Sequence, residues 1–291
     1  MRENLDPSYG FLELQDKILE IAVDVDAICR ANDIDYCLMG GSALGQKRHG
    51  GFIPWDDDLD IFMTPDNYEK FRKVFKETGD HEKYYLQEWG LTDGMVTISK
   101  IRMNGTAYIE NALKDWDIHH GIYIDIFILH TCPNHKIQQM WQCLWAKYVI
   151  MKGLAIRGYT GRGGFLGFAL KVMACMPDRM WIKYGLKQVY KYRDKQTDYY
   201  CNFMGRAVFG HAIYDKKFFT PTVYAPFEKV ELKVPENLHE FLTYRFGDYM
   251  TPPDAASIKR MQHAEFWNTG RDFRETMLKC TEKFVDEARL I

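Results

Sequence analysis

Four carboxylates stand immediately before an apolar segment near residue 60. The stretch "GGFIPWDDDLDIFM" places Asp56, Asp57, Asp58 and Asp60 within five positions, and the apolar residues 61–63 that follow resemble a buried strand. Like charges this close repel one another, and burying them costs free energy unless solvent or a cation compensates them. The run by itself fits a solvated acidic turn as well as a metal site at the edge of a core.

The spacing of two of these acids favours the metal site. If residues 58–63 form a strand, Asp58 and Asp60 point to the same side of it, with Cα atoms about 6–7 Å apart. Hard cations such as Mg²⁺ take oxygen ligands, and two-metal sites hold their ions about 3.5–4 Å apart. The pair therefore suits a metal site to which a neighbouring strand adds a third carboxylate.

Asp125 is the candidate for that third carboxylate, because it is the single acid in the apolar segment "GIYIDIFIL". An acid with apolar residues on both sides is costly to bury without a charge partner. Upstream, Gly40, Gly41 and Ser42 follow a predicted strand. Glycines there let backbone N–H groups approach a phosphate at the start of a helix. Together these features favour a metal and phosphate site over an acidic turn.

Hydrophobic periodicity predicts an α+β fold in which a mixed sheet is flanked by helices. Ser42 is expected to cap a helical turn, and Thr64 with Pro65 to start a helix. Predicted helices cover 11–31, 65–78, 236–245 and the C-terminus, and a helical region runs from about 135 to 200. Predicted strands cover 35–39, 58–63, 84–88, 95–103 and 122–128, and a β-like region reads "TVYAPFEKVELKV".

Composition indicates a globular cytoplasmic protein. The chain has 291 residues, of which 46% are hydrophobic, and no Pro/Ser/Gly-rich linker divides it. The N-terminal residues lack the apolar stretch of a signal peptide, and no uncharged apolar run of about 18 residues predicts a spanning helix. Seven cysteines form no C-x-x-C pair, which indicates reduced thiols rather than disulfides or a zinc site.

Positive charge is concentrated in residues 136–206, where 13 Lys or Arg residues stand against three acids. The same segment is rich in Trp, Phe, Leu and Met. It is either an ordinary helical subdomain with a basic face or a surface that docks on an anionic membrane leaflet. No recognised nucleic-acid motif accompanies the charge, so we expect no nucleic-acid partner.

The order of these motifs resembles the nucleotidyltransferase superfamily, with Gly-Gly/Ser, then Asp-apolar-Asp, then a distal Asp between apolar residues. The text "GGSALGQKRHGGFIPWDDDLDIFM" is closer still to the LicD family of phosphocholine and related phosphotransferases, which is related to the fukutin group. "ISKIRMNGTAYI", "GIYIDIFIL" and "YRFGDYMTPP" resemble further family segments. The resemblance is strong over about 35–130, recognisable over about 220–265 and absent over about 135–205.

The resemblance implies a nucleotidyltransferase-like core whose carboxylates hold metal. Asp58, Asp60 and Asp125 would be the catalytic and metal-binding acids, with Asp56 as a further ligand. Asp57 is expected to face away from Asp58 as a supporting or capping residue. The expected donor and phosphate ligands are Gly41, Ser42, Arg48, His49, Lys100 and Arg102. For His49, a turn position is an equal alternative, and Trp55 is more simply a packed aromatic.

The implied reaction moves phosphocholine or a related substituted phosphate from a CDP-linked donor to a hydroxyl of a cell-surface glycan precursor and releases CMP. The implied cofactor is Mg²⁺, as two ions, with Mn²⁺ as the alternative. The partners would be the donor, a glycan or lipid-linked glycan acceptor and, through 136–206, an anionic membrane surface. In that case the protein would lie peripherally at the inner face of the membrane.

Two other functions remain open. The first is nucleotidyl transfer to a small-molecule hydroxyl, which would release pyrophosphate instead of CMP. The second is a non-catalytic binding scaffold, although such proteins usually lose one of the metal acids and this chain has all three. A glycosyltransferase with a D-x-D motif would not require the upstream glycines. The expected organisation is a catalytic core over 1–134, a basic helical insertion over 135–206 and a C-terminal part over 207–291 that completes the core.

Overall fold

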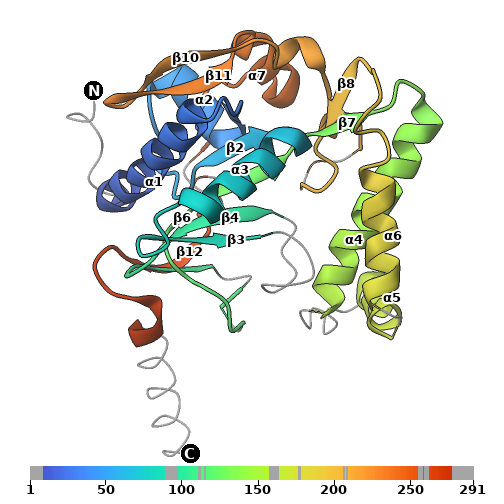
Figure 1. The fold of residues 1–291 in the computed structure, drawn as a ribbon, viewed down its shortest axis with the longest axis horizontal. Coiled ribbons are helices and arrows are strands. Elements are labelled where there is room, and N and C mark those ends of the chain that lie inside the picture. The colour runs from blue at the N-terminus through green and yellow to red at the C-terminus, as the bar shows by residue number, and fades with distance from the viewer. Residues whose placement is uncertain are drawn as a thin grey trace, which may run out of the picture.

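The structure, a computed structural model, describes residues 9–88, 98–110, 113–114, 116–156, 164–175, 178–205, 207, 209–254, 258 and 262–276. Its centre is a five-stranded mixed sheet with the strand order β1-β2-β6-β4-β3 (Figure 1). Within this sheet β2 and β6 run parallel, and every other neighbouring pair is antiparallel. The strands are β1 (Cys37–Leu38), β2 (Asp60–Met63), β3 (Tyr84–Gln87), β4 (Ser99–Met103) and β6 (Tyr123–Ile128).

The two faces of the sheet have opposite character. One face is apolar, and its isoleucines at 61, 101, 124 and 126 are at most 2% exposed. Helices α1 (Leu12–Ala31) and α3 (Pro65–Thr78) cover this face. The hydroxyl of Tyr68 on α3 lies 2.6 Å from Ser99 Oγ, and Tyr84 on β3 donates a hydrogen bond to Asp24 on α1. The opposite face carries the acids Asp60 and Asp125 at one end and the aromatic residues Phe62 and Phe127 at the other.

Both covering helices confirm the prediction from periodicity. The apolar positions of α1 at 14, 18, 21 and 25 are buried in the core, as are Tyr68, Phe71 and Phe75 of α3. At the start of α3, Thr64 Oγ1 accepts a hydrogen bond from the backbone N–H of Asn67, and Pro65 occupies the first turn. The predicted mixed α+β architecture is therefore observed.

The segment around the acidic run departs from the expectation in two ways. Helix α2 (Gly40–His49) starts two residues before Ser42 and has Met39 at its N-cap, so the predicted cap at Ser42 is wrong. Gly40 makes the earlier start feasible, because its φ of +54° is accessible to glycine at little cost. Strand β2 begins only at Asp60, so Asp58 precedes the strand rather than sharing a strand face with Asp60.

Later parts of the chain complete the core. The β-like region is a hairpin of β10 (Thr222–Phe227) and β11 (Val230–Pro235), followed by α7 (Leu238–Phe246). Strand β12 (Ala264–Asn268) pairs antiparallel with β5 (Ala107–Glu110). Periodicity predicts neither strand because both are short, and their pairing joins segments that are far apart in sequence. The expected C-terminal helix falls mainly on residues 277–291, outside the described residues.

Three helices stand beside the central sheet on the right of Figure 1. They are α4 (Lys136–Ile156), α5 (Gly164–Ala174) and α6 (Asp178–Val189), and α4 and α6 contribute to a separate apolar cluster. A small sheet of β7 (His130–Cys132), β8 (Tyr199–Cys201) and β9 (Ile213–Asp215) lies at their ends, with short 3-10 helices at Phe209–Ala212 and Lys216–Phe218. The boundaries at 134 and 206 stay a prediction.

Two further expectations concern the described residues. None of the helices in this part of the chain is long and apolar enough to cross a membrane. Six cysteines lie in the described ranges and all are free thiols; five of them are buried, whereas Cys175 is exposed. The expected reduced thiols are therefore observed at these positions, and Cys280 lies outside the described residues.

Gly45 lies within α2, and the turn that leads from α2 to the acidic run packs directly against it. A Cβ atom on Gly45 would lie 2.5 Å from the carbonyl oxygen of Gly51 and 3.1 Å from the backbone nitrogen of Ile53, and neither backbone atom is free to move. We expect Gly45→Ala to lower the free energy of unfolding by about 1–3 kcal/mol, as overpacked cores do. Urea unfolding followed by circular dichroism measures this loss.

The matched control is Gly210→Ala, where the added Cβ meets no atom within 4 Å. Equal stability of the two variants would show that the contact between α2 and the following turn tolerates a side chain at position 45.

Candidate functional site

The polar face of the sheet carries a row of charged side chains across three neighbouring strands. Asp60 on β2 is the register partner of Asp125 on β6, and Asp125 is the partner of Lys100 on β4. Residues abreast on neighbouring strands share a face, so the two carboxylates and the ammonium group lie side by side. The Lys100 Nζ atom is 2.7 Å from Asp125 Oδ1. The predicted partnership of Asp60 with Asp125 is thus a direct consequence of strand register.

Glu110 on β5 extends this row of charges, because it contacts both Lys100 and Arg102 on β4. Its carboxylate is 3.4 Å from Lys100 Nζ and 3.1 Å from Arg102 Nη2. Burial acts to raise the pKa of Glu110, but Lys100 and Arg102 outweigh it and lower the pKa to about 2. Arg102 also donates to Gln87 Oε1 and to the carbonyl oxygen of Gly121, and it is fully buried.

The start of α2 lies against two of the carboxylates. A Cβ atom on Gly40 would lie 3.2 Å from Asp60 Oδ2, and one on Gly41 would lie 2.7 Å from Asp56 Oδ2. Both glycines therefore leave room that the carboxylates use. The first N–H groups of a helix have no partner within the helix and carry partial positive charge, so they favour anions at this position. The glycine pair predicted from the sequence is part of the site.

The loop between α2 and β2 is fixed at several points. Gln15 on α1 is almost fully buried, and its amide donates to the carbonyl oxygens of Ile53 and Asp56 at 3.1 and 2.9 Å. Ser42 Oγ accepts a hydrogen bond of 2.8 Å from the backbone N–H of Asp60. Ser42 is 3% exposed, which leaves it little surface for a phosphate. We assign its hydroxyl to holding β2 against α2.

Asp57 does not face away from Asp58 as expected, because ligand atoms of both carboxylates and of His263 lie within 4.8 Å of one another. Its Oδ2 atom accepts hydrogen bonds from the backbone N–H groups of His263 and Ala264, at 2.7 and 2.8 Å. Its Oδ1 atom lies 3.2 Å from His263 Nδ1, which is also 3.3 Å from Asp58 Oδ2. Burial acts to raise the pKa of Asp57, but these hydrogen bonds outweigh it and hold the pKa below its ordinary value. Asp57 and Asp58 in turn raise the pKa of His263 to about 11, so the ring is cationic.

The other carboxylates are short of positive charge. Burial, followed by the charge of Asp58, raises the pKa of both Asp56 and Asp60 well above the ordinary value. Burial also raises the pKa of Asp125 to about 6, although Lys100 acts in the opposite direction. Among the described residues the cluster has six carboxylates and four cationic groups, which leaves two negative charges when all are ionised. The groups are Asp56, Asp57, Asp58, Asp60, Glu110 and Asp125, and Arg48, Lys100, Arg102 and His263.

This composition fits a divalent cation. Carboxylate oxygens are the ligands that Mg²⁺ and Mn²⁺ take, and a bound cation would supply the missing charge. Ligand atoms of Asp57, Asp58 and His263 lie within 4.8 Å of one another, which makes them an acidic group able to hold a metal ion. In this conformation, however, both Asp57 oxygens accept hydrogen bonds and the His263 proton occupies the space between the carboxylates. The oxygens of Asp56, Asp58, Asp60 and Asp125 are therefore the better donor set.

Arg48 and His49 lie at the C-terminal end of α2. Arg48 Nε donates to His49 Nε2 at 2.9 Å, and its Nη1 donates to the carbonyl oxygen of Tyr249 at 2.8 Å. Arg48 also acts to lower the pKa of Asp56, so its charge reaches the carboxylate cluster. Trp55 is 8% exposed and lies beside both side chains, which fits the simpler expectation of a packed aromatic.

The structure therefore brings most of the predicted residues together at the site, but not all of them in the expected role. Arg102 is buried within the sheet, so we assign it to Glu110 and Gly121 rather than to the diphosphate of a donor. Two residues of the cluster were missed. Glu110 ends the apolar segment "AYIE" and has the same signature as Asp125, an acid beside buried strand residues, so it was open to prediction. His263 has no local signal, because its place depends on the pairing of β12 with β5.

A family model and one curated relative both name LicD. The family described as LicD/FKTN/FKRP, nucleotidyltransferase domain, matches residues 33–152. This range includes the site residues named above except Gln15, Tyr249, His263 and Ala264. The lipopolysaccharide cholinephosphotransferase LicD of Haemophilus influenzae is 28% identical over 244 residues, which are 78% of this chain and 86% of that protein. An uncharacterized protein of Rickettsia typhi is 33% identical over 75 residues, 24% of each chain.

Gly41 gives a test of the cradle around Asp56. We expect Gly41→Ala to displace the Asp56 carboxylate, because the added Cβ would lie 2.7 Å from Oδ2. The carboxylate is the end of a side chain and is free to rotate, so the fold should persist while the affinity for Mn²⁺ falls by about tenfold or more, which corresponds to about 1.4 kcal/mol. Isothermal titration with Mn²⁺ measures it, with Gly210→Ala as control. An unchanged affinity would remove Asp56 from the donor set.

Asp57 and Asp60 are expected to affect stability in opposite directions. Asp57→Ala leaves two backbone N–H groups and a cationic ring without their acceptor, so we expect a loss of about 3–5 kcal/mol in the free energy of unfolding. Urea unfolding in the presence of a chelator measures it.

Asp60→Asn in the same assay serves as the comparison. It removes one of the repelling charges and should raise the free energy of unfolding of the metal-free protein, because burial and the neighbouring carboxylates disfavour the ionised form of Asp60. Destabilisation by Asp60→Asn as large as that by Asp57→Ala would contradict the assignment of unbalanced charge to the cluster.

Proposed function

Since this chain belongs to the LicD family, we propose that it is a metal-dependent phosphotransferase. It moves phosphocholine or a related substituted phosphate from a CDP-linked donor to a hydroxyl of a cell-surface glycan precursor. The five-stranded sheet is its nucleotidyltransferase core. The similarity to the cholinephosphotransferase of H. influenzae extends over most of both chains and supports this activity.

One observation carries the proposal. The strand register places Asp60 beside Asp125, and the glycines at the start of α2 place Asp56 and Asp60 against one helix N-terminus. The result is a group of buried carboxylates with too few cations around it. A binding scaffold gains no stability from carboxylates that repel one another. A metal-dependent transferase needs these carboxylates, because they hold its ions.

The proposed metal ligands are Asp56, Asp58, Asp60 and Asp125, and Mg²⁺ is the proposed ion. When bound, such an ion polarises phosphoryl oxygens and offsets the negative charge that develops during transfer. The protein's own contribution is positional. Ser42 and the strand ladder fix Asp60, Lys100 fixes Asp125, and His263 holds the side of Asp58 that faces Asp57.

The transfer itself requires one proton acceptor. The acceptor hydroxyl oxygen forms a bond to the phosphorus that carries the choline or other head group, and the bond from that phosphorus to the oxygen of the CMP leaving group breaks. The hydroxyl proton goes to Asp125, and CMP leaves with the electron pair of the broken bond. Lys100 keeps the Asp125 carboxylate in place from the neighbouring strand.

Donor binding is proposed for the cationic and backbone groups around the carboxylates. Arg48 and His49 at the end of α2, Lys100 on β4 and the backbone of Gly41 are the proposed contacts to the nucleotide and its phosphates. Arg48 is held through the Tyr249 carbonyl, which brings the segment "GDYM" to the site from the C-terminal part of the chain. Arg102 and Ser42 support these groups from within the core.

A donor panel tests the reaction. We expect the protein with Mg²⁺ to release CMP from at least one member of a set of CDP-choline, CDP-ribitol and CDP-glycerol when a glycan acceptor is present. Asp58→Asn, Asp60→Asn and Asp125→Asn should each lower the rate by about 10³-fold or more, because each removes a charge from the metal site. Circular dichroism checks that the variants remain folded.

Asp194→Asn is the matched control, because Asp194 is exposed and lies outside the cluster. Near-normal turnover in any of the three site variants would refute the assignment of that residue. Release of pyrophosphate from a nucleoside triphosphate, without CMP release from any CDP-linked donor, would favour the alternative of nucleotidyl transfer.

A further inference from the structure

One face of α4 exposes apolar side chains to solvent. Ile137, Met140, Trp141 and Leu144 follow the spacing i, i+3, i+4, i+7, so they form one stripe along the helix. Their exposed fractions are 83%, 55%, 44% and 59%. Soluble domains tolerate single exposed apolar residues, but a continuous group of this size indicates an interaction surface.

The stripe continues across the neighbouring helix. Trp141 Nε1 donates to Gln188 Oε1 on α6 at 3.2 Å, and Trp145 of α4 lies 4.8 Å from the ring of Tyr184 on α6. Tyr184 is 44% exposed and Met180, one turn before it, is 64% exposed. The seam between the two helices is therefore lined with aromatic rings that are covered on one side and open to solvent on the other.

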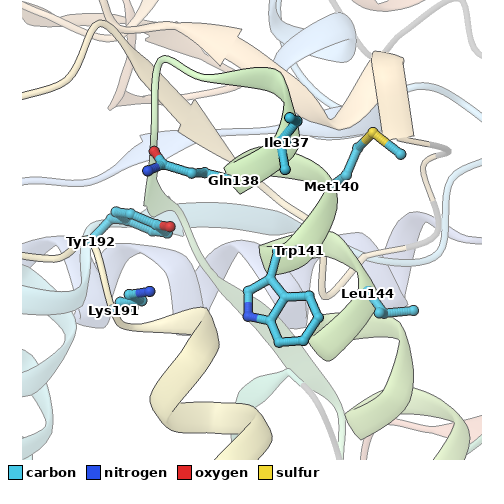
Figure 2. Close-up of a pocket in the computed structure, with 7 residues that line it drawn as sticks. All are labelled: Ile137, Gln138, Met140, Trp141, Leu144, Lys191 and Tyr192. Carbon is cyan, nitrogen blue, oxygen red and sulfur yellow. The ribbon is translucent and has the colours of Figure 1, made fainter.

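A hollow of about 590 Å³ lies at one end of this seam. Figure 2 shows its lining, with the α4 stripe on one side and the segment that carries Lys191 and Tyr192 on the other. The lining is almost entirely apolar apart from Gln138 and the Lys191 ammonium group. A shallow apolar hollow beside a cationic group suits an amphiphile with an anionic head.

Lysines border the same surface in a regular row. Lys183 and Lys187 are one turn apart on α6, and Lys191 and Lys195 follow at the same spacing in the turns after it. All four are exposed, and within the described part of the chain none of them forms an ion pair. Asp194 is the one acid among residues 180–196. This surface is therefore cationic at its border and apolar at its centre.

We propose that the exposed face of α4 and α6 docks on an anionic membrane leaflet. The Trp, Tyr, Met, Ile and Leu side chains enter the boundary between head groups and acyl chains, and the lysine row contacts the anionic head groups. The helices lie on the leaflet and do not cross it. This inference goes beyond the proposed function and does not depend on it, because it concerns a different surface and a different ligand.

The charge pattern favours a leaflet over a second copy of this chain. A twofold contact through this face would place the lysine rows of both copies near each other, and within the described residues no acidic patch on the face offsets them. An anionic leaflet attracts the same row at each position along it. Each lysine near such a surface contributes to binding, and the contributions add along the row.

Co-sedimentation of the full chain with vesicles tests the proposal. One set contains phosphatidylglycerol and phosphatidylcholine, and the other contains phosphatidylcholine alone. We expect binding to the anionic set with at least about tenfold preference over the neutral set. Lys187→Glu with Lys191→Glu should lower the partition coefficient on anionic vesicles at least tenfold, and Leu144→Asp should lower it by a similar factor.

Matched controls use equally exposed positions elsewhere. Lys73→Glu with Lys229→Glu repeats the charge change on α3 and in the β10–β11 turn, and Met250→Asp repeats the apolar change at a side chain that is 54% exposed. These should bind as the parent does. Vesicle binding is measured without substrate, so its failure and a failure of the phosphotransferase assay are distinct results.

Three results would overturn the proposal. They are equal binding to neutral and anionic vesicles, no binding to either, and an unchanged partition coefficient in the lysine and Leu144 variants. Sedimentation velocity could give a fourth contrary result. If the protein is a dimer and Leu144→Asp dissociates it, the face mediates contact between two copies of the chain. Circular dichroism of each variant confirms that its helices are intact.

Discussion

Repulsion among the carboxylates on one face of the central sheet has a free-energy cost that the rest of the structure must offset. Asp60 and Asp125 are neighbours because β2 and β6 are parallel and in register, and Asp56 and Asp58 reach the same place from the preceding loop. A folded chain keeps such an arrangement only when other contacts offset its cost. Those contacts come from nearly every part of the core.

The supports differ in kind. Backbone and amide hydrogen bonds hold the positions, as when Gln15 binds the loop carbonyls and Ser42 accepts from the Asp60 N–H. Cations offset part of the charge, as Lys100 does for Asp125 and the cationic His263 ring does for Asp58. The glycines of α2 add space, because any side chain at position 41 would collide with Asp56. What remains after these supports is the charge that a divalent ion would neutralise.

The helices α4 to α6 have the reverse pattern, with lysines and exposed apolar rings instead of buried acids. The two parts are connected by the β7-β8-β9 sheet and by Arg193, whose Nε donates to Asp66 Oδ1 at the start of α3 at 2.7 Å. In the proposed arrangement the acidic site performs the transfer and the basic surface holds the protein at a leaflet. The two regions differ in charge because their proposed ligands do: a metal ion binds to anionic groups, and an anionic leaflet binds to cationic groups.

The sequence by itself determined the local elements and the central acids. Periodicity and capping residues gave α1 and α3 nearly to the residue, and the apolar neighbours of Asp125 marked it as a buried acid. These features depend on residues close in the chain, which is why a linear pattern predicts them. The start of α2 and the place of Asp58 were missed, since both depend on contacts with distant residues.

Only the tertiary structure decided which charges meet. His263 reaches Asp57 and Asp58 because β12 pairs with β5, and Glu110 reaches Lys100 from β5, a strand outside the central sheet. Arg102 looked like a nucleotide ligand from its spacing with Lys100, yet the packing around it buries it completely. Spacing along a strand fixes the face on which a side chain lies, whereas burial and charge partners depend on what the rest of the chain places on that face.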